Sequence, residues 1–173
     1  TQAPTFATVP GAVTVSCDAE VPNDLAVATD NCDAQVTVTE TQQTEPGACA
    51  DSYTIIRVFT ATDDCGNTAT ASQVVTVEDT ASPTFSNVPA DLTLACDEPL
   101  PTEAPIATDN CDTQVDVVEI QNTEPGACED AYTVVRTWTA TDNCGNTDRE
   151  QQTITVGEEF DAVISVDPKE ICA

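Results

Sequence analysis

Residues 60–68 read TATDDCGNT, and residues 139–147 read TATDNCGNT. In each tract, a threonine-rich stretch of the kind that favours β-strands runs into a tight turn. Gly66 or Gly145 can adopt a positive φ there, and the following asparagine tolerates one. Extending the alignment outward matches residues 5–79 with residues 84–158 without a gap, and 40 of the 75 aligned positions are identical. The chain is therefore a tandem repeat of two small modules with a period of 79 residues.

Eight of the nine cysteines obey the same displacement. They are Cys17, Cys32, Cys49 and Cys65 in the first module, and Cys96, Cys111, Cys128 and Cys144 in the second. Modules of this size bury little surface, and small secreted domains commonly rely on disulfides instead. The sequence has no histidine and no C-x2-C spacing of the kind found in zinc sites. The pattern predicts two disulfides in each module and an oxidising, extracellular compartment.

Apolar residues alternate with polar ones, whereas the spacings of three and four typical of helices are nearly absent. We expect strands at about residues 5–9, 12–17, 36–42, 52–62 and 69–77, with the same set 79 residues later. The segment 18–33 is expected to be a long crossover. This pattern predicts an all-β fold of tandem antiparallel immunoglobulin-like β-sandwich modules. We assign the modules to residues 1–79 and 80–158, and interpret residues 159–173 as the start of a different immunoglobulin-like module or a C-terminal tail.

Strand length limits how the cysteines can pair. A strand over residues 52–62 would separate its ends by roughly 36 Å. Cys49 therefore cannot bond Cys65, because a disulfide needs Cα atoms within about 7 Å of each other. The register that sets Cys32 opposite Cys65 also sets Glu40 opposite Arg57, which is a favourable cross-strand pair.

That register places Val38 opposite Phe59 and Val36 opposite Ala61, and the second module repeats it with Glu119 opposite Arg136, Val117 opposite Trp138 and Val115 opposite Ala140. We therefore expect four bonds: Cys32 to Cys65, Cys17 to Cys49, Cys111 to Cys144 and Cys96 to Cys128. The alternative pairs Cys17 with Cys65 and Cys32 with Cys49.

The charge balance is strongly acidic. The chain carries 31 acidic and 4 basic residues, for a formal charge of −27. Phosphate backbones require clustered lysine and arginine, so nucleic acid is excluded as a partner. Self-repulsion at this density favours bound cations that screen it, although a solvated acidic surface would also keep the protein soluble. No apolar run approaches the roughly 20 residues of a membrane-spanning helix.

Acidic and amide side chains gather in the turns beside the cysteines and where the modules meet. Calcium takes six to eight oxygen ligands, and such turns can supply them. The candidate calcium ligands are Asp30, Asp33, Asp63, Asp64 and Asn67 in the first module, Glu78 and Asp79 where the modules meet, and Asp109, Asp112, Asp142 and Asn146 in the second. The same side chains could instead cap turns through local hydrogen bonds, and Pro83 alone could stiffen the linker.

Catalytic motifs are missing from the sequence. It has no histidine to act as a base, no nucleophile elbow and no glycine-rich phosphate loop. Asp30 and Asp63 could form a glycosidase-like carboxylate pair, but so acidic a chain produces such pairs by chance. The aromatic residues that alternate along one strand of each module, Tyr53, Phe59, Tyr132 and Trp138, are expected in the core. We therefore expect a protein that is not an enzyme.

The two TATD tracts, together with VEDTASPTF at residues 77–85, resemble the hyalin repeat, in which a related motif closes an immunoglobulin-like sandwich. The resemblance covers about residues 1–158. It is closest to the cysteine-bearing variant repeated in giant surface adhesins of gliding and related bacteria, which leave the cell by type IX secretion. Arg57 and Arg136 stand where the usual pattern is apolar.

The resemblance implies an extracellular module on a bacterial cell surface. The leading hypothesis is a non-catalytic stalk or filament segment, with neighbouring repeats of the same chain as partners and lateral filament contacts as a further option. The alternative is a module that binds glycan or another surface through exposed loops. Asp79-Thr80-Ala81 also resembles an O-glycosylation motif of related bacteria, with Thr80 as the acceptor. Cys172 falls outside the period, and its partner could lie further along the chain or in another filament.

Overall fold

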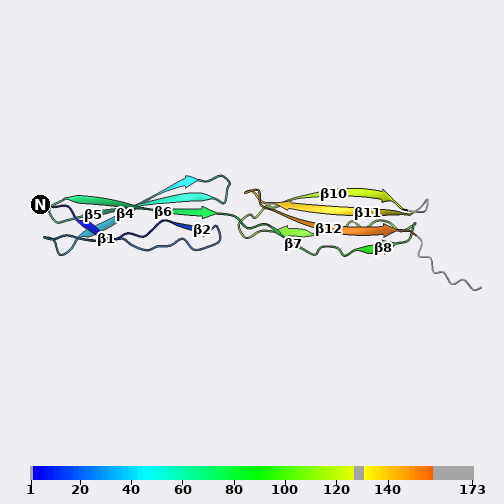
Figure 1. Ribbon diagram of the computed structural model, residues 1–173, viewed down its shortest axis with the longest axis horizontal. Coiled ribbons are helices and arrows are strands. Elements are labelled where there is room, and N and C mark those ends of the chain that lie inside the picture. The colour runs from blue at the N-terminus through cyan, green and yellow to red at the C-terminus, as the bar shows by residue number, and fades with distance from the viewer. Residues whose placement is uncertain (1, 127–130, 158–173) are drawn as a thin grey trace, which may run out of the picture.

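The computed structural model describes residues 2–126 and 131–157, which form two modules joined end to end (Figure 1). The first module contains β1 (Thr5–Thr8), β2 (Val13–Ser16), β3 (Val27–Thr29), β4 (Thr37–Pro46), β5 (Tyr53–Thr62) and β6 (Thr68–Glu78). The second repeats them as β7 (Thr84–Ser86), β8 (Leu92–Leu94), β9 (Ile106–Thr108), β10 (Asp116–Pro125), β11 (Tyr132–Thr141) and β12 (Thr147–Val156). In the described residues, no helix is long and apolar enough to cross a membrane.

Each module packs a four-stranded sheet against a two-stranded one. The sheets of the first module have the strand orders β2-β6-β5-β4 and β1-β3, and those of the second have the orders β8-β12-β11-β10 and β7-β9. The all-β prediction of tandem sandwiches is confirmed. Two details differ from it: β2 runs parallel to β6, as β8 does to β12, and the short strand β3 lies inside the segment expected to be a crossover. The proposed tail at residues 159–173 lies outside the described residues.

The predicted hairpin register was wrong by two residues. Glu40 lies opposite Phe59 rather than Arg57, and Glu119 lies opposite Trp138 rather than Arg136. The prediction fixed its register through a bond between Cys32 and Cys65 that is not formed. Instead, the turn closes where the Gly47 amide donates to the Ser52 carbonyl at 2.8 Å.

A shift of two residues keeps every side chain on its own face of the sheet. The glutamate therefore still reaches the arginine, now along the diagonal. The same holds for the predicted aromatic and valine pairs, which remain on one face in a staggered order. The two-residue error therefore left the predicted set of side chains on each face of the sheet unchanged. Only the directly opposite cross-strand pairs changed.

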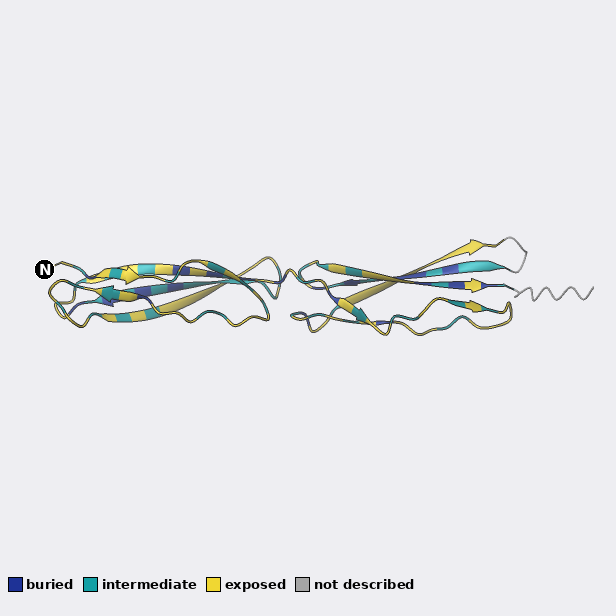
Figure 2. Cartoon of the chain, turned by 60° about the horizontal axis from the view of Figure 1, so that its bottom comes forward, coloured by how far each residue is buried: buried dark blue, intermediate teal, exposed yellow. Residues whose placement is uncertain are grey.

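The core follows the alternation of the inner strands, where Figure 2 shows buried positions as dark bands. In the first module, Phe59, Ala61, Val75 and Val77 are buried, and Trp138, Ala140, Ile154 and Val156 repeat this set in the second. Phe59 and Trp138 therefore belong to the core, as expected, whereas Tyr53 and Tyr132 are half-buried. One of the two sheets in each module has only two strands, so few apolar side chains are fully buried.

A buried arginine extends this narrow core. Arg57 is 1% exposed, and its guanidinium donates to Glu40 through Nε at 2.7 Å and Nη2 at 2.9 Å. Nη1 donates to Gln73 Oε1 at 2.7 Å and to the Pro22 carbonyl at 3.3 Å. The guanidinium also lies over the ring of Phe59, 5.1 Å from its centroid. These bonds attach the long segment before β3 to the main sheet, because the same guanidinium contacts Pro22 in that segment and Gln73 in the sheet.

The second module repeats the network. Arg136 donates to Glu119 at 2.8 Å and to Gln152 at 3.2 Å, and Trp138 Nε1 donates to the same glutamate at 3.0 Å. The hydrogen bond from Arg57 is the main cause that lowers the pKa of Glu40, and the one from Arg136 lowers the pKa of Glu119. The arginines that depart from the hyalin pattern are thus part of the core.

We expect Glu40→Ala to destabilise the protein by roughly 1.5–3 kcal/mol, because it removes charged hydrogen bonds from an arginine that stays buried. The measurement is urea unfolding followed by tryptophan fluorescence and circular dichroism. Glu45→Ala, at an exposed position of the same strand, is the control and should stay within about 0.5 kcal/mol of the parent. Equal effects of the two substitutions would contradict the role given to Arg57.

Candidate functional site

The junction, defined as the linker Asp79–Pro83 and the loops that meet around it, is the candidate site. Two disulfides cross it from one module to the other. Cys17 bonds Cys111 with a Cα–Cα distance of 6.0 Å, and Cys49 bonds Cys144 with a Cα–Cα distance of 5.0 Å. Both distances suit a disulfide. The modules are therefore covalently joined at two points besides the chain itself.

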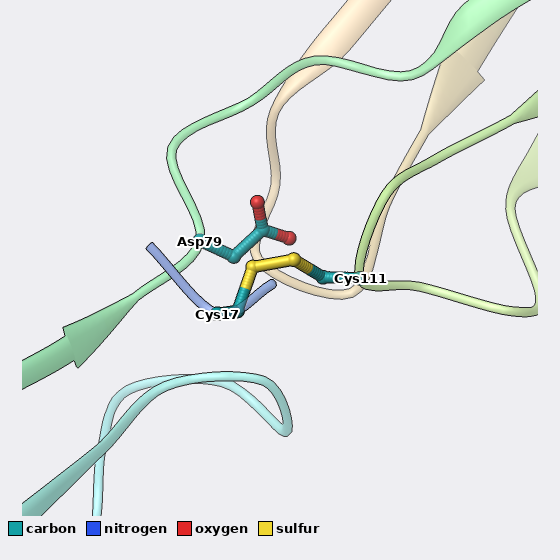
Figure 3. A group of neighbouring side chains, drawn as sticks. All are labelled: Cys17, Asp79 and Cys111. Carbon is teal, nitrogen blue, oxygen red and sulfur yellow. A yellow bond between two sulfur atoms is a disulfide. The ribbon is translucent and has the colours of Figure 1, made fainter. Parts of the chain in front are cut away.

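The first module contributes the cysteines at the end of its main sheet. Cys17 directly follows β2, and its amide donates to the Glu78 carbonyl at 3.1 Å, which continues the pairing of β2 with β6. This bond holds the sulfur beside Asp79 at the start of the linker (Figure 3).

Cys49 lies in the turn between β4 and β5, where its carbonyl accepts from the Ser52 amide at 3.2 Å. The turn is tight: a Cβ on Gly47 would lie 2.6 Å from the Ser52 carbonyl oxygen, so only glycine fits there.

The second module contributes its cysteines from two loops that aspartates hold in shape. Asp109 Oδ1 accepts from the Cys111 amide at 2.9 Å, and Asp142 Oδ1 accepts from the Cys144 amide at 2.9 Å. Gly145 has a φ of 88°, which a glycine adopts without strain. These loops, residues 109–112 and 142–146, are called the receiving loops below.

A further aspartate ties the two receiving loops together, since Asp112 Oδ2 accepts from the Asn143 amide at 2.9 Å. Polar contacts then connect these loops to the first module. Asn143 donates its side-chain amide to the Asp51 carboxylate of the first module. Asn110 also reaches the first module, where its hydrogen bond to Asp18, together with one from Ser16, lowers the pKa of Asp18. The interface thus combines covalent and hydrogen-bonded contacts.

The predicted pairing of these cysteines was wrong. The structure replaces the expected bonds Cys17 to Cys49 and Cys111 to Cys144 with bonds between modules, and it forms no bond between Cys32 and Cys65. The alternative pairing, Cys17 to Cys65 and Cys32 to Cys49, is wrong as well. The expected bond from Cys96 to Cys128 involves a residue outside the described ones.

The physical reason is the short linker. Only residues 79–83 separate β6 from β7, and Pro83 within them is buried. The receiving loops are thereby pressed onto the end of the first module, where each sulfur meets a sulfur of the neighbouring module. Strand length correctly separated Cys49 from Cys65, and the favoured pairing correctly grouped Cys17 with Cys49 at one end of the module. The error lay in pairing cysteines within that end.

Three carboxylates converge at the junction. Asp79, Asp109 and Asp142 each place an oxygen within 4.8 Å of the others. Asp79 is 6% exposed, and among the described residues Oδ2 of Asp79 and Oδ2 of Asp109 are buried without a hydrogen-bond partner. Burial, and then the charges of Asp109, Asp142 and Asp51, raise the pKa of Asp79 above its ordinary value. Unpartnered buried carboxylate oxygens are costly unless a cation or a proton neutralises them.

Asn146 links this cluster to the linker backbone. Its side-chain amide donates to Asp142 Oδ2 at 2.8 Å and to the Asp79 carbonyl at 3.3 Å. Cys17 and Cys111 also lie beside Asp79, but their sulfurs are bonded to each other and cannot act as thiolate ligands. The chemistry of the remaining donors is all oxygen, which suits a hard cation.

The other predicted calcium ligands have different places in the structure. Asp30 and Asp63 accept backbone hydrogen bonds within their own turns, Asp33 Oδ2 accepts from the Asp64 amide, and Asn67 donates to Asp63. Glu78 is exposed. The carboxylate cluster found in the described residues draws on none of these.

Sequence reasoning missed two junction residues, Asp51 and Ser52, and it placed Asn110 and Asn143 in the polar loop clusters without naming them as ligands. Ser52 Oγ accepts from the Asp79 amide at 3.4 Å, and its hydroxyl lies 3.0 Å from Cys49 Sγ, which as a disulfide sulfur can only accept. Ser52 and Asn143 carried a usable signal, because the repeat has Ala131 in place of Ser52 and Asp64 in place of Asn143, whereas TEPGAC is identical in both modules. Such a local difference indicates a position whose surroundings differ between the two modules.

Fold and junction together define a class: tandem β-sandwich repeats with four cysteines each. A family model for HYR-like domains with 4 cysteines matches residues 5–77 and again residues 84–156. The chain belongs to this family, with two tandem copies. The comparison with curated proteins finds no match.

Several solved structures are similar at low scores. Drosophila N-cadherin EC1-4 has 13% sequence identity and a TM-score of 0.39, and the alignment covers 91% of this chain and 50% of that one. Human protocadherin-24 EC1-2 has 15% identity and a TM-score of 0.37, with 92% and 100% covered. This chain thus spans half the length of the N-cadherin fragment. The likeness says nothing about ligands.

The junction predicts a definite disulfide map. Digestion without reduction, with thiols blocked by alkylation at low pH, should yield peptides that link Cys17 to Cys111 and Cys49 to Cys144. Mass spectrometry identifies both links. A peptide that links Cys17 to Cys49 would restore the pairing within a module and contradict the structure.

The buried carboxylates predict that Asp79→Asn stabilises the protein at neutral pH in the presence of chelator. The folded pKa of Asp79 is raised, so its charge opposes folding fully above that pKa, and the penalty fades as pH falls toward its ordinary value of 3.8. The gain should therefore shrink on acidification. Thermal unfolding between pH 4 and pH 8 measures it, and a loss of stability at pH 7 in chelator would contradict the account.

Proposed function

We propose that this chain is a non-catalytic stalk segment of an extracellular adhesin or filament, in which disulfides across each module junction hold the repeats as a rigid rod. The single observation that carries the proposal is the pair of bonds from Cys17 to Cys111 and from Cys49 to Cys144. One bond would still allow the modules to swivel about it. Two bonds at separate points of the same interface oppose both bending and twisting.

The bonds also shorten the covalent path along the chain. Their partners are 94 and 95 residues apart in sequence, so a chain stretched from end to end can bypass that many residues through either bond. Force applied to the ends would then load the disulfides, and the bypassed residues would stay unextended. A structure with few apolar core residues is protected from extension in this way.

The receiving loops support the stalk over a binding role. In the second module the tracts ATDNCD and CGNT, which could otherwise present an adhesive loop surface, lie against the first module. Lateral contacts between filaments or with cell-surface glycan would have to use the sides of the modules. Their edge strands β4 and β10 are largely exposed.

The proposal extends to a calcium ion at the junction. Asp79, Asp109 and Asp142 offer converging carboxylates from the linker and from both receiving loops. In the described part of the chain, Asp79 and Asp109 each have one buried oxygen without a hydrogen-bond partner. Calcium would neutralise the repulsion that the short linker creates and add water ligands to complete its shell. It would thus stiffen the same joint as the disulfides.

Location on a bacterial surface, type IX secretion and a part in gliding motility follow from the hyalin-repeat resemblance and belong to this proposal. Disulfide bonds fit an oxidising, extracellular setting. Thr80 is exposed in the linker, so an O-linked glycan could be attached there without unfolding the junction.

Force spectroscopy tests the rod directly. Reduction should lengthen the fully stretched chain by about 300 Å, because each freed residue adds roughly 3.3–3.6 Å. The variant Cys32→Ser with Cys65→Ser is the control and should keep the short length until reductant is added. An oxidised chain that extends as far as the reduced one would contradict the shortened path.

Calcium should raise the thermal unfolding midpoint relative to chelator. The free energy of unfolding should increase by about 2.7 kcal/mol when the free ion is 100-fold above its Kd. Asp109→Asn should abolish most of this gain. The matched control is Asp30→Asn, the equivalent residue of the first module, which lies outside the carboxylate cluster and should keep the full gain. A midpoint unaffected by chelation would remove calcium from the proposal and leave the disulfide rod standing.

A further inference from the structure

The first module has its own copy of the receiving loops at the end away from the junction. The period of 79 residues makes Cys32 the equivalent of Cys111, and Cys65 the equivalent of Cys144. In the described part of the chain, Cys32 and Cys65 are exposed and form no disulfide, whereas their two equivalents are both bonded to another module. The same chemical groups are thus engaged at one site and exposed at the other.

The two sets of loops have nearly the same geometry. Asp30 Oδ1 accepts from the Cys32 amide at 2.8 Å, against 2.9 Å for Asp109 and Cys111. Asp63 Oδ1 accepts from the Cys65 amide at 3.0 Å, against 2.9 Å in the second module. The glycines that close the turns have φ values of 84° and 88°.

The contact that ties the two loops together is also repeated. Asp33 Oδ2 accepts from the Asp64 amide at 2.9 Å, the same distance as between Asp112 and Asn143. The loops of the first module therefore hold their cysteines in the bonding arrangement without a bond. A surface prearranged in this way loses little conformational freedom when a partner docks.

The carboxylates repeat as well, but only in part. Asp30 and Asp63 correspond to Asp109 and Asp142. The third member of the junction cluster, Asp79, belongs to the module before the receiving loops. A module docked in front of Cys32 and Cys65 would supply that carboxylate together with two cysteines, and so complete the site.

We propose that Cys32 and Cys65 are the covalent docking site for a further module of the same family, which attaches through cysteines equivalent to Cys17 and Cys49. Every junction of such an array would then be joined by two disulfides. This inference rests on the junction chemistry of the proposed function. It goes beyond it by assigning an occupant to the exposed end of the first module.

Each new bond requires an oxidant, and a small or protein disulfide supplies it. The thiolate of one cysteine attacks the oxidant disulfide, forms a mixed disulfide and releases one thiol. The thiolate of the partner cysteine then attacks the mixed disulfide and releases the second thiol. Two cysteine thiols and one oxidant disulfide thus give one cysteine disulfide and two oxidant thiols, and the two electrons pass to the oxidant.

The test is a three-module chain in which a copy of residues 1–79 is fused directly before Thr1, which preserves the natural spacing. Exposed substitutions Thr14→Ser and Ala50→Ser in the added copy give its cysteine peptides distinct masses. After folding with a glutathione redox pair, digestion at acidic residues under non-reducing conditions should link the first cysteine of the added copy to Cys32, and its third to Cys65. The control carries Cys32→Ser and Cys65→Ser, and should lose both links while it keeps Cys17 bonded to Cys111.

The unfused chain provides a second measurement. Without reduction, alkylation should modify both Cys32 and Cys65. A Cys32 to Cys65 bond in either chain would overturn the inference, as would alkylation of the first and third cysteines of the added copy in a folded three-module chain. Loss of the bond between Cys17 and Cys111 in the unfused chain would instead overturn the proposed function, so the two failures can be told apart.

Discussion

The pair of disulfides across the junction is the constraint on which the rest of the structure depends. In chain order the four cysteines alternate between the two bonds, so each bond closes a loop that overlaps the other, of 94 and 95 residues. In the chain-entropy account, a loop of this length restricts the unfolded state by about 4–5 kcal/mol. Bonds confined to one module would close much shorter loops. The chosen pairing therefore gives more stability per cysteine, and it makes the folding of one module depend on its neighbour.

The junction also explains how so acidic a chain tolerates close packing. Inside each module one buried arginine, Arg57 or Arg136, is neutralised by a glutamate and hydrogen-bonded to a glutamine. At the junction like charges meet instead, because the linker brings Asp79 against Asp109 and Asp142. Covalent bonds hold these charges together against their repulsion. A cation bound there would relieve this repulsion. In a chain with a net charge of −27, cation binding would thus stiffen the junction.

Alternation, the period and the turn residues were sufficient to predict the all-β fold and most strands. The short strand β3 was missed because Pro22 and weak alternation hide it, and it is held by pairing with β1 rather than by its own pattern. Three members of the junction cluster, Asp79, Asp109 and Asp142, were among the predicted ligands, but their convergence could not be foreseen. Cys32 and Cys111 are equivalent in a perfect repeat, so either could be the partner of Cys17. Only the placement of one module against the next decides between them, and the short linker with its buried Pro83 sets that placement.

The central claim is that two disulfides make two small modules into one rigid body. Residual dipolar couplings of backbone amides test it most directly, because each module reports its own alignment in a dilute oriented medium. With the bonds intact, amides of β5 and β6 should fit the same alignment tensor as those of β11 and β12, and reduction should split it into two tensors. Tensors of different magnitude in the oxidised protein, with both bonds present, would contradict the claim.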